Sequence, residues 1–87
     1  MSDAETPEDL AGRLASALTP LSEIAIVLEL DHKRLEAEVK AGTSPLAKAI
    51  LKGTMLTRTA FREVVIKQAL NGSSPAQGLV AEMMKRI

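Results

Sequence analysis

The sequence predicts an all-α protein of five helices. Only one of its 87 residues, Phe61, is aromatic, so the core has to be built from aliphatic side chains, which suit packed helices. All four prolines follow a serine or threonine, and a hydroxyl side chain before a proline is typical of a helix start. Together with Asp31, a good cap that follows the apolar Leu30, these pairs predict five helix starts.

The first helix is predicted over residues 7–18. Its start is Thr6-Pro7, and acidic Glu8 and Asp9 in the first turn match the helix dipole. Leu10, Leu14, Ala17 and Leu18 recur at helical spacing and define the face expected to be buried.

The other four helices are delimited by similar signals. Gly42 ends the third and Asn71-Gly72 ends the fourth, since glycine readily adopts the backbone conformation that follows a helix. Gly53 lies inside the fourth helix, whose continuity at that point is left open. The predicted ranges are 20–28, 32–41, 45–70 and 75–86.

The chain length fits one helical domain, residues 1–87. Within it we expect residues 1–5 to be disordered, residues 20–41 to form a helix-turn-helix, and residues 45–87 to form a helical hairpin that can support oligomerisation.

The sequence lacks the residues that several classes of function require. The chain has no cysteine and one histidine, His32, so neither a metal site nor a histidine-activated nucleophile is expected. No phosphate-binding Gly-Lys-Ser/Thr loop is present. We therefore expect no enzyme, no metal and no cofactor. With no signal peptide and no apolar run of membrane-spanning length, we expect no membrane association and a cytoplasmic location in a bacterial host cell.

Charge is distributed unevenly along a chain whose formal net charge is zero. Residues 1–31 carry seven acidic side chains and one basic, whereas residues 32–87 carry ten basic and four acidic. Such asymmetry can create a locally positive surface. The alternative is that both segments are ordinary solvated helix faces.

Residues 20–41 resemble a helix-turn-helix. Such a motif needs two short helices that cross closely, and Ala25 provides a small residue for that crossing. The turn position usually filled by glycine is Glu29, which implies either a less left-handed turn or some strain. The alternative is a plain helical hairpin. The side chains expected to face the core are Ile24, Leu28, Leu30, Leu35 and Val39.

In a helix-turn-helix, the second helix enters the major groove by its N-terminal end. Lys33 and Arg34 would reach phosphates or guanine edges there, while Glu36 and Glu38 would be repelled by phosphate. The candidate DNA-binding residues on this helix are His32, Lys33, Arg34, Ala37 and Lys40.

A basic stripe is predicted on the fourth helix within an arc of roughly 120°, opposite an apolar side with Ile50, Phe61 and Val64. Its candidate DNA-binding residues are Lys48, Lys52, Arg58 and Arg62. Leu51, Met55 and Ile66 lie at its margins, where they form either a subunit interface or part of the core.

Residues 19–87 resemble the small terminase subunits of tailed phages and prophages. The resemblance is carried by Leu21-Ser22-Glu23-Ile24-Ala25-Ile26-Val27-Leu28, Thr43-Ser44-Pro45-Leu46-Ala47-Lys48-Ala49 and Ala69-Leu70-Asn71-Gly72-Ser73-Ser74-Pro75-Ala76. It implies recognition of viral DNA for packaging, a homo-oligomeric ring, and a large terminase subunit as partner. Two alternatives remain open: a helical interaction or assembly module that does not bind DNA, and a small transcription regulator.

Overall fold

The structure, a computed structural model, describes residues 5–86, and the expectation of disorder at residues 1–4 lies outside that range. The described residues contain five α-helices and no strand, as the sequence predicts. The helices are α1 (Pro7–Ser16), α2 (Leu21–Leu28), α3 (His32–Ala41), α4 (Pro45–Leu70) and α5 (Ser74–Met84). None of them is long and apolar enough to span a bilayer.

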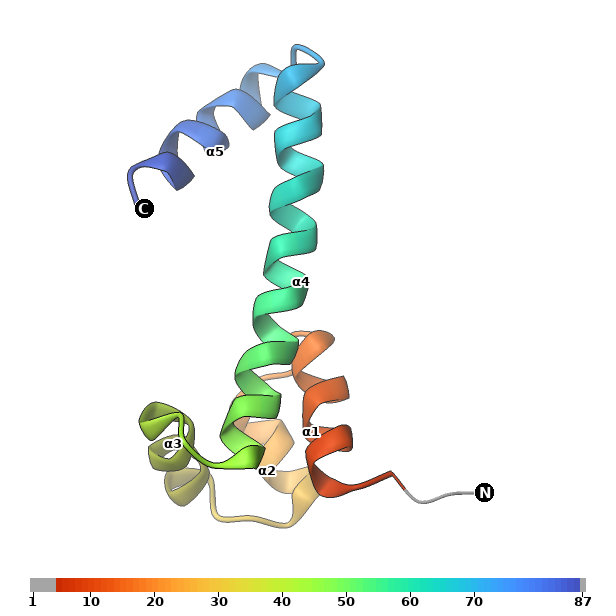
Figure 1. Cartoon of the computed structure of the whole chain (residues 1–87), viewed down its shortest axis with the longest axis vertical. Helices are drawn as coiled ribbons and strands as arrows, with labels where there is room; N and C mark the ends of the chain where they lie inside the picture. Colours follow the sequence, from red (N-terminus) through yellow and green to blue (C-terminus); the bar gives the residue numbers. More distant parts are fainter. Residues whose placement is uncertain (1–4, 87) are drawn as a thin grey trace. The chain divides into compact units, whose positions relative to one another are not determined.

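The chain forms two compact units, Met1–Thr57 and Arg58–Ile87. In the first unit, α1, α2 and α3 gather around the first turns of α4 (Figure 1). The second unit contains the last turns of α4 and the whole of α5, which turns back after α4 ends (Figure 1).

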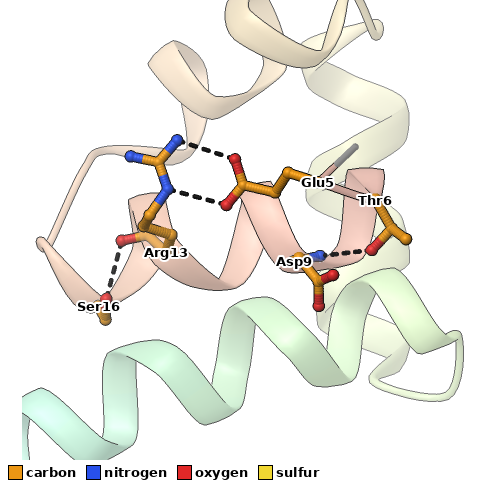
Figure 2. Close-up of polar contacts among 5 residues, drawn as sticks. All are labelled: Glu5, Thr6, Asp9, Arg13 and Ser16. Atoms are coloured by element: carbon orange, nitrogen blue, oxygen red, sulfur yellow. Dashed lines mark hydrogen bonds and ion pairs between the residues drawn. The ribbon is translucent and has the colours of Figure 1, made fainter. Parts of the chain in front are cut away.

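Helix α1 is held by short-range polar contacts (Figure 2). The Thr6 hydroxyl accepts a hydrogen bond from the Asp9 amide at 3.0 Å, which caps the helix as predicted. Glu5 forms a two-point ion pair with Arg13, with N···O distances of 2.9 and 3.0 Å. The hydrogen bond from Arg13 lowers the pKa of the Glu5 carboxyl.

Helix α1 ends earlier than predicted, at Ser16. Leu18 adopts a left-handed backbone conformation with φ 60°, and its amide and that of Thr19 donate to Ala15 and Leu14 carbonyls. This hydrogen-bond pair is a Schellman motif, the usual way to satisfy the last carbonyls of a helix. The prediction that Ala17 and Leu18 lie on the buried face is therefore wrong, since both are exposed.

Two of the four predicted Ser/Thr-Pro starts are shifted by one residue. Thr6 and Ser44 cap α1 and α4 as predicted. Helix α2 instead begins after Pro20, which makes no side-chain capping hydrogen bond, while the Thr19 amide donates to the Leu14 carbonyl at the end of α1. Helix α5 is capped by Ser73, whose hydroxyl accepts from the Ala76 amide at 3.3 Å.

The core of the first unit is small and aliphatic. Half-buried leucines and a valine pack around it, and the described chain has no buried polar or charged residue. Because many of the buried positions are alanine, helix backbones approach one another closely. The buried cluster consists of Ala11, Ala15, Ile24, Ala25, Leu35 and Ile50.

Helices α1 and α4 approach each other closely at Gly12 and Gly53. A Cβ atom on Gly53 would overlap the carbonyl oxygen of Gly12 and would lie 3.1 Å from the Ser16 amide nitrogen. The Thr57 hydroxyl donates a hydrogen bond to the Ser16 carbonyl nearby. Gly53 therefore does not interrupt α4, which is continuous from Pro45 to Leu70; its missing side chain makes room for α1.

The second unit has little buried surface of its own. Ala76 is its only buried residue in the described part of the chain, whereas Phe61, Val64 and Leu70 are 64%, 53% and 81% exposed. The turn between α4 and α5 is a Schellman motif with Gly72 at φ 96°. The apolar side predicted for α4 is thus buried at Ile50 but exposed along its last turns.

Candidate nucleic-acid interface

Helices α2 and α3 are joined by a three-residue turn whose geometry depends on Glu29. This residue has φ 56° and ψ 45°, the left-handed conformation. Its amide donates to the Ile26 carbonyl at 3.1 Å, and the Leu30 amide donates to the Ala25 carbonyl at 2.8 Å. Of the two possibilities that the sequence left at Glu29, the fully left-handed turn is the one observed.

The inner faces of the two helices pack as the sequence predicts, with one exception. Ile24, Ala25 and Leu35 are 1–2% exposed, and Leu28 and Val39 pack against them. Leu30 was expected to fill the turn, but its side chain is 43% exposed. Its backbone amide closes the turn instead, by donating to the Ala25 carbonyl.

The outer face of α3 carries three of the five DNA-binding residues predicted on this helix. With Leu35 facing the core, Lys33, Ala37 and Lys40 fall on the opposite side of the helix within about 60°. All five candidates on this helix are exposed. Asp31 caps the helix by accepting from the Arg34 amide at 3.0 Å, so the Lys33–Arg34 end is fixed in place.

Two glutamates on α3 differ in their surroundings. Glu38 accepts a hydrogen bond from the Ser44 hydroxyl at 2.8 Å, and that hydroxyl also accepts from the Ala47 amide at 3.0 Å. The Glu38 carboxylate is thereby held at the start of α4. Glu36 is exposed and makes the surface less positive beside Lys33.

The basic residues predicted on α4 are all exposed but belong to different units. Lys48 and Lys52, one turn apart, lie in the first unit with α3. Arg58 and Arg62, also one turn apart, lie in the second. The predicted stripe thus consists of two pairs, one in each unit.

The three residues predicted at an oligomer interface are not equivalent. Leu51 is half-buried and lies beside Gly42, where a Cβ atom would come within 3.6 Å of a Leu51 methyl carbon. Met55 and Ile66 are 55% and 43% exposed. Only Met55 and Ile66 present a large part of their surface for contact with another molecule.

Sequence reasoning did not single out a second exposed apolar region, on α2. Ile26 and Val27 are 73% and 49% exposed, beside the exposed Leu30. The helical periodicity of this segment carries a signal for it, since Ile26 falls opposite Ile24 on a helix of about 100° per residue. In the described residues no group of three or more histidine, cysteine, aspartate or glutamate side chains is arranged to hold a metal ion.

The chain matches no protein-family model, no curated protein and no solved structure.

Proposed function

We propose that this chain is a DNA-binding helix-turn-helix protein of phage or prophage type. The proposal depends on one observation: the left-handed turn at Glu29 packs α2 against α3 through Ala25 and Leu35, while Lys33 and Arg34 stay exposed. A short helix, a tight turn and a second helix with a basic, exposed N-terminal end are the parts that a major-groove reader needs.

In this proposal the N-terminal half of α3 lies in the major groove of duplex DNA. Lys33 and Arg34 bind phosphates or guanine edges, and Ala37, which is small and exposed, lets the helix approach the bases closely. Lys40 and the Lys48–Lys52 pair add phosphate contacts from the same unit.

The charge of the first unit limits the affinity of one copy. Residues 1–57 carry nine acidic and six basic side chains, a net charge of −3. Attraction to DNA therefore comes from the local arrangement on α3 rather than from the charge of the whole unit. Tight binding is expected only when several copies bind one DNA molecule together.

The proposed role is recognition of viral DNA for packaging, with a large terminase subunit as partner. Its support is the resemblance of residues 19–87 to small terminase subunits. A small transcription regulator with the same helix-turn-helix would show part of that resemblance. A large terminase gene beside the gene for this chain would favour packaging, whereas an operator in its own promoter region that the chain binds would favour regulation.

DNA binding is tested by fluorescence anisotropy with a labelled duplex of mixed sequence, over a series of salt concentrations. Lys33→Glu with Arg34→Glu should abolish binding at moderate salt and leave the helix content by circular dichroism unchanged. Loss of two phosphate contacts should also make the dependence of log K on log salt shallower by about 2.

The control is Lys67→Glu with Lys85→Glu, which changes the net charge equally at exposed positions of the second unit. It should bind DNA much more tightly than the α3 variant. Equal loss in both variants would show non-specific attraction only, and a Lys33/Arg34 variant that binds like the parent would refute the assignment of α3.

An assembly module that does not bind DNA is the second candidate. It is favoured by the large exposed apolar side chains of α4, among them Phe61 and Val64. A stable oligomer that gives no anisotropy change with duplex DNA even at low salt would support this function and exclude the first.

A further inference from the structure

The second unit contains an apolar groove whose lining includes two arginines. A cavity of about 540 Å³ lies between the last turns of α4 and α5. Its lining is Arg62, Ile66, Val80, Met83, Met84 and Arg86. Methionine side chains are flexible and polarizable, so this surface can adapt to an inserted apolar side chain, and the two guanidinium groups favour an acidic surround.

The first unit presents an exposed apolar surface with acidic instead of basic side chains, which we call the α2 patch. It consists of the exposed apolar side chains Ile26, Val27 and Leu30, together with Glu23 and Glu29. Glu23 is three and four residues from Ile26 and Val27, so the three are neighbours on the helix surface. Glu29 directly follows α2 and is exposed.

We propose that the α2 patch of one copy docks in the groove of the second unit of another copy. The two surfaces are complementary in both apolar content and charge: branched aliphatic side chains with two carboxylates meet a methionine-rich groove with two arginines. The net charges of the two segments are opposite in sign, which also favours the contact. Residues 1–57 carry −3, and residues 58–87, with five basic and two acidic side chains, carry +3.

The symmetry of this contact follows from its two different surfaces. Each copy has one patch and one groove, so the interface is heterologous and continues from copy to copy into a ring or an open chain. Because Lys33 and Arg34 take no part in it, this association needs no DNA and stands independently of the proposed function. Arg62, which the sequence predicts as a DNA contact, lines the groove in this proposal.

The first measurement is sedimentation velocity of the full chain without DNA over a range of concentrations. The parent should associate as concentration rises. Ile26 is 73% exposed, so Ile26→Ser removes little buried surface from the folded chain. This substitution should weaken association about tenfold or more. A parent that sediments as a monomer at every concentration would overturn the proposal.

A charge exchange tests the pairing itself. Arg62→Glu with Arg86→Glu, and separately Glu23→Lys with Glu29→Lys, should each associate poorly alone because like charges then face each other. An equimolar mixture of the two variants should associate again, since every junction between unlike copies restores an attractive pairing. The Lys67→Glu/Lys85→Glu variant, which keeps Arg62 and Arg86 in the groove, should lose much less association than the Arg62→Glu/Arg86→Glu variant.

The mixture gives the decisive outcome. If both variants keep their helix content by circular dichroism and remain monomeric when mixed, the α2 patch and the groove do not contact each other and the proposal is wrong. Association of either variant alone at the parental level would refute it equally.

Discussion

Gly53 of α4 lies against the backbone of Gly12 in α1, so closely that a methyl group on Gly53 would overlap the Gly12 carbonyl oxygen. Gly53→Ala should therefore destabilise the first unit by about 1–3 kcal/mol, because α1 and α4 have to move apart in a packed core. Chemical denaturation followed by circular dichroism measures the loss.

The reciprocal substitution is the control. A Cβ atom on Gly12 would lie 3.5 Å from the Ala49 carbonyl oxygen, an ordinary contact. Gly12→Ala should be neutral or stabilising by up to about 1 kcal/mol, since alanine favours the helix more than glycine does. Equal destabilisation by both substitutions would contradict the asymmetric geometry of this crossing.

The turn at Glu29 predicts a stabilising substitution. A left-handed conformation costs a non-glycine residue roughly 1–2 kcal/mol, and glycine recovers part of that while making the unfolded chain more flexible. Glu29→Gly should raise the unfolding free energy by a few tenths to about 1 kcal/mol. Glu29→Val should lower it, because a β-branched residue tolerates this conformation poorly. A destabilised glycine variant would mean that the turn is not left-handed.

Ser44 links two elements through one hydroxyl, which accepts from the Ala47 amide and donates to Glu38. Ser44→Ala should cost about 1 kcal/mol from the loss of the cap. Ser44→Thr keeps a hydroxyl and should retain most of the stability. Thermal unfolding of the two variants compares them, and an alanine variant as stable as the threonine one would argue against the cap.

The Glu5–Arg13 pair predicts a local effect of pH. Because the pKa of Glu5 is lowered in the folded chain, the contribution of the pair is present above the ordinary pKa of a glutamate and is lost as the pH falls through the lowered value. Arg13→Met should raise the Glu5 pKa toward its ordinary value, as carboxyl NMR titration would reveal. Arg58→Met should leave it unchanged. The pair is exposed, so its effect on thermal stability should be small.

The helix bounds were predictable where a residue type fixes them. Helices α3 and α4 have the predicted bounds. Asp31 and Ser44 cap the starts of α3 and α4 through their side chains, and Gly42 ends α3 in a left-handed conformation. The end of α1 was not predictable, since Leu18 adopts a left-handed conformation that leucine rarely favours.

The candidate interface was predictable to the extent that helical periodicity determines it. Once Leu35 faces inward, Lys33, Ala37 and Lys40 have to face outward. Long-range contacts carry no such local signal. Gly53 looks like a helix breaker in the sequence, and only its approach to Gly12 explains it. The groove depends on how α5 returns to α4, which the residues of neither helix specify alone.

Helix α4 passes without interruption from a unit with a packed core into a second unit where, among the described residues 58–86, only Ala76 is buried. Backbone amides along one continuous helix should therefore exchange with solvent deuterium at very different rates, slowly near Ile50 and rapidly near Leu70. Binding of another molecule to the last turns of α4 would slow amide exchange there. The exchange rates near Leu70 therefore show whether this end of the helix is covered.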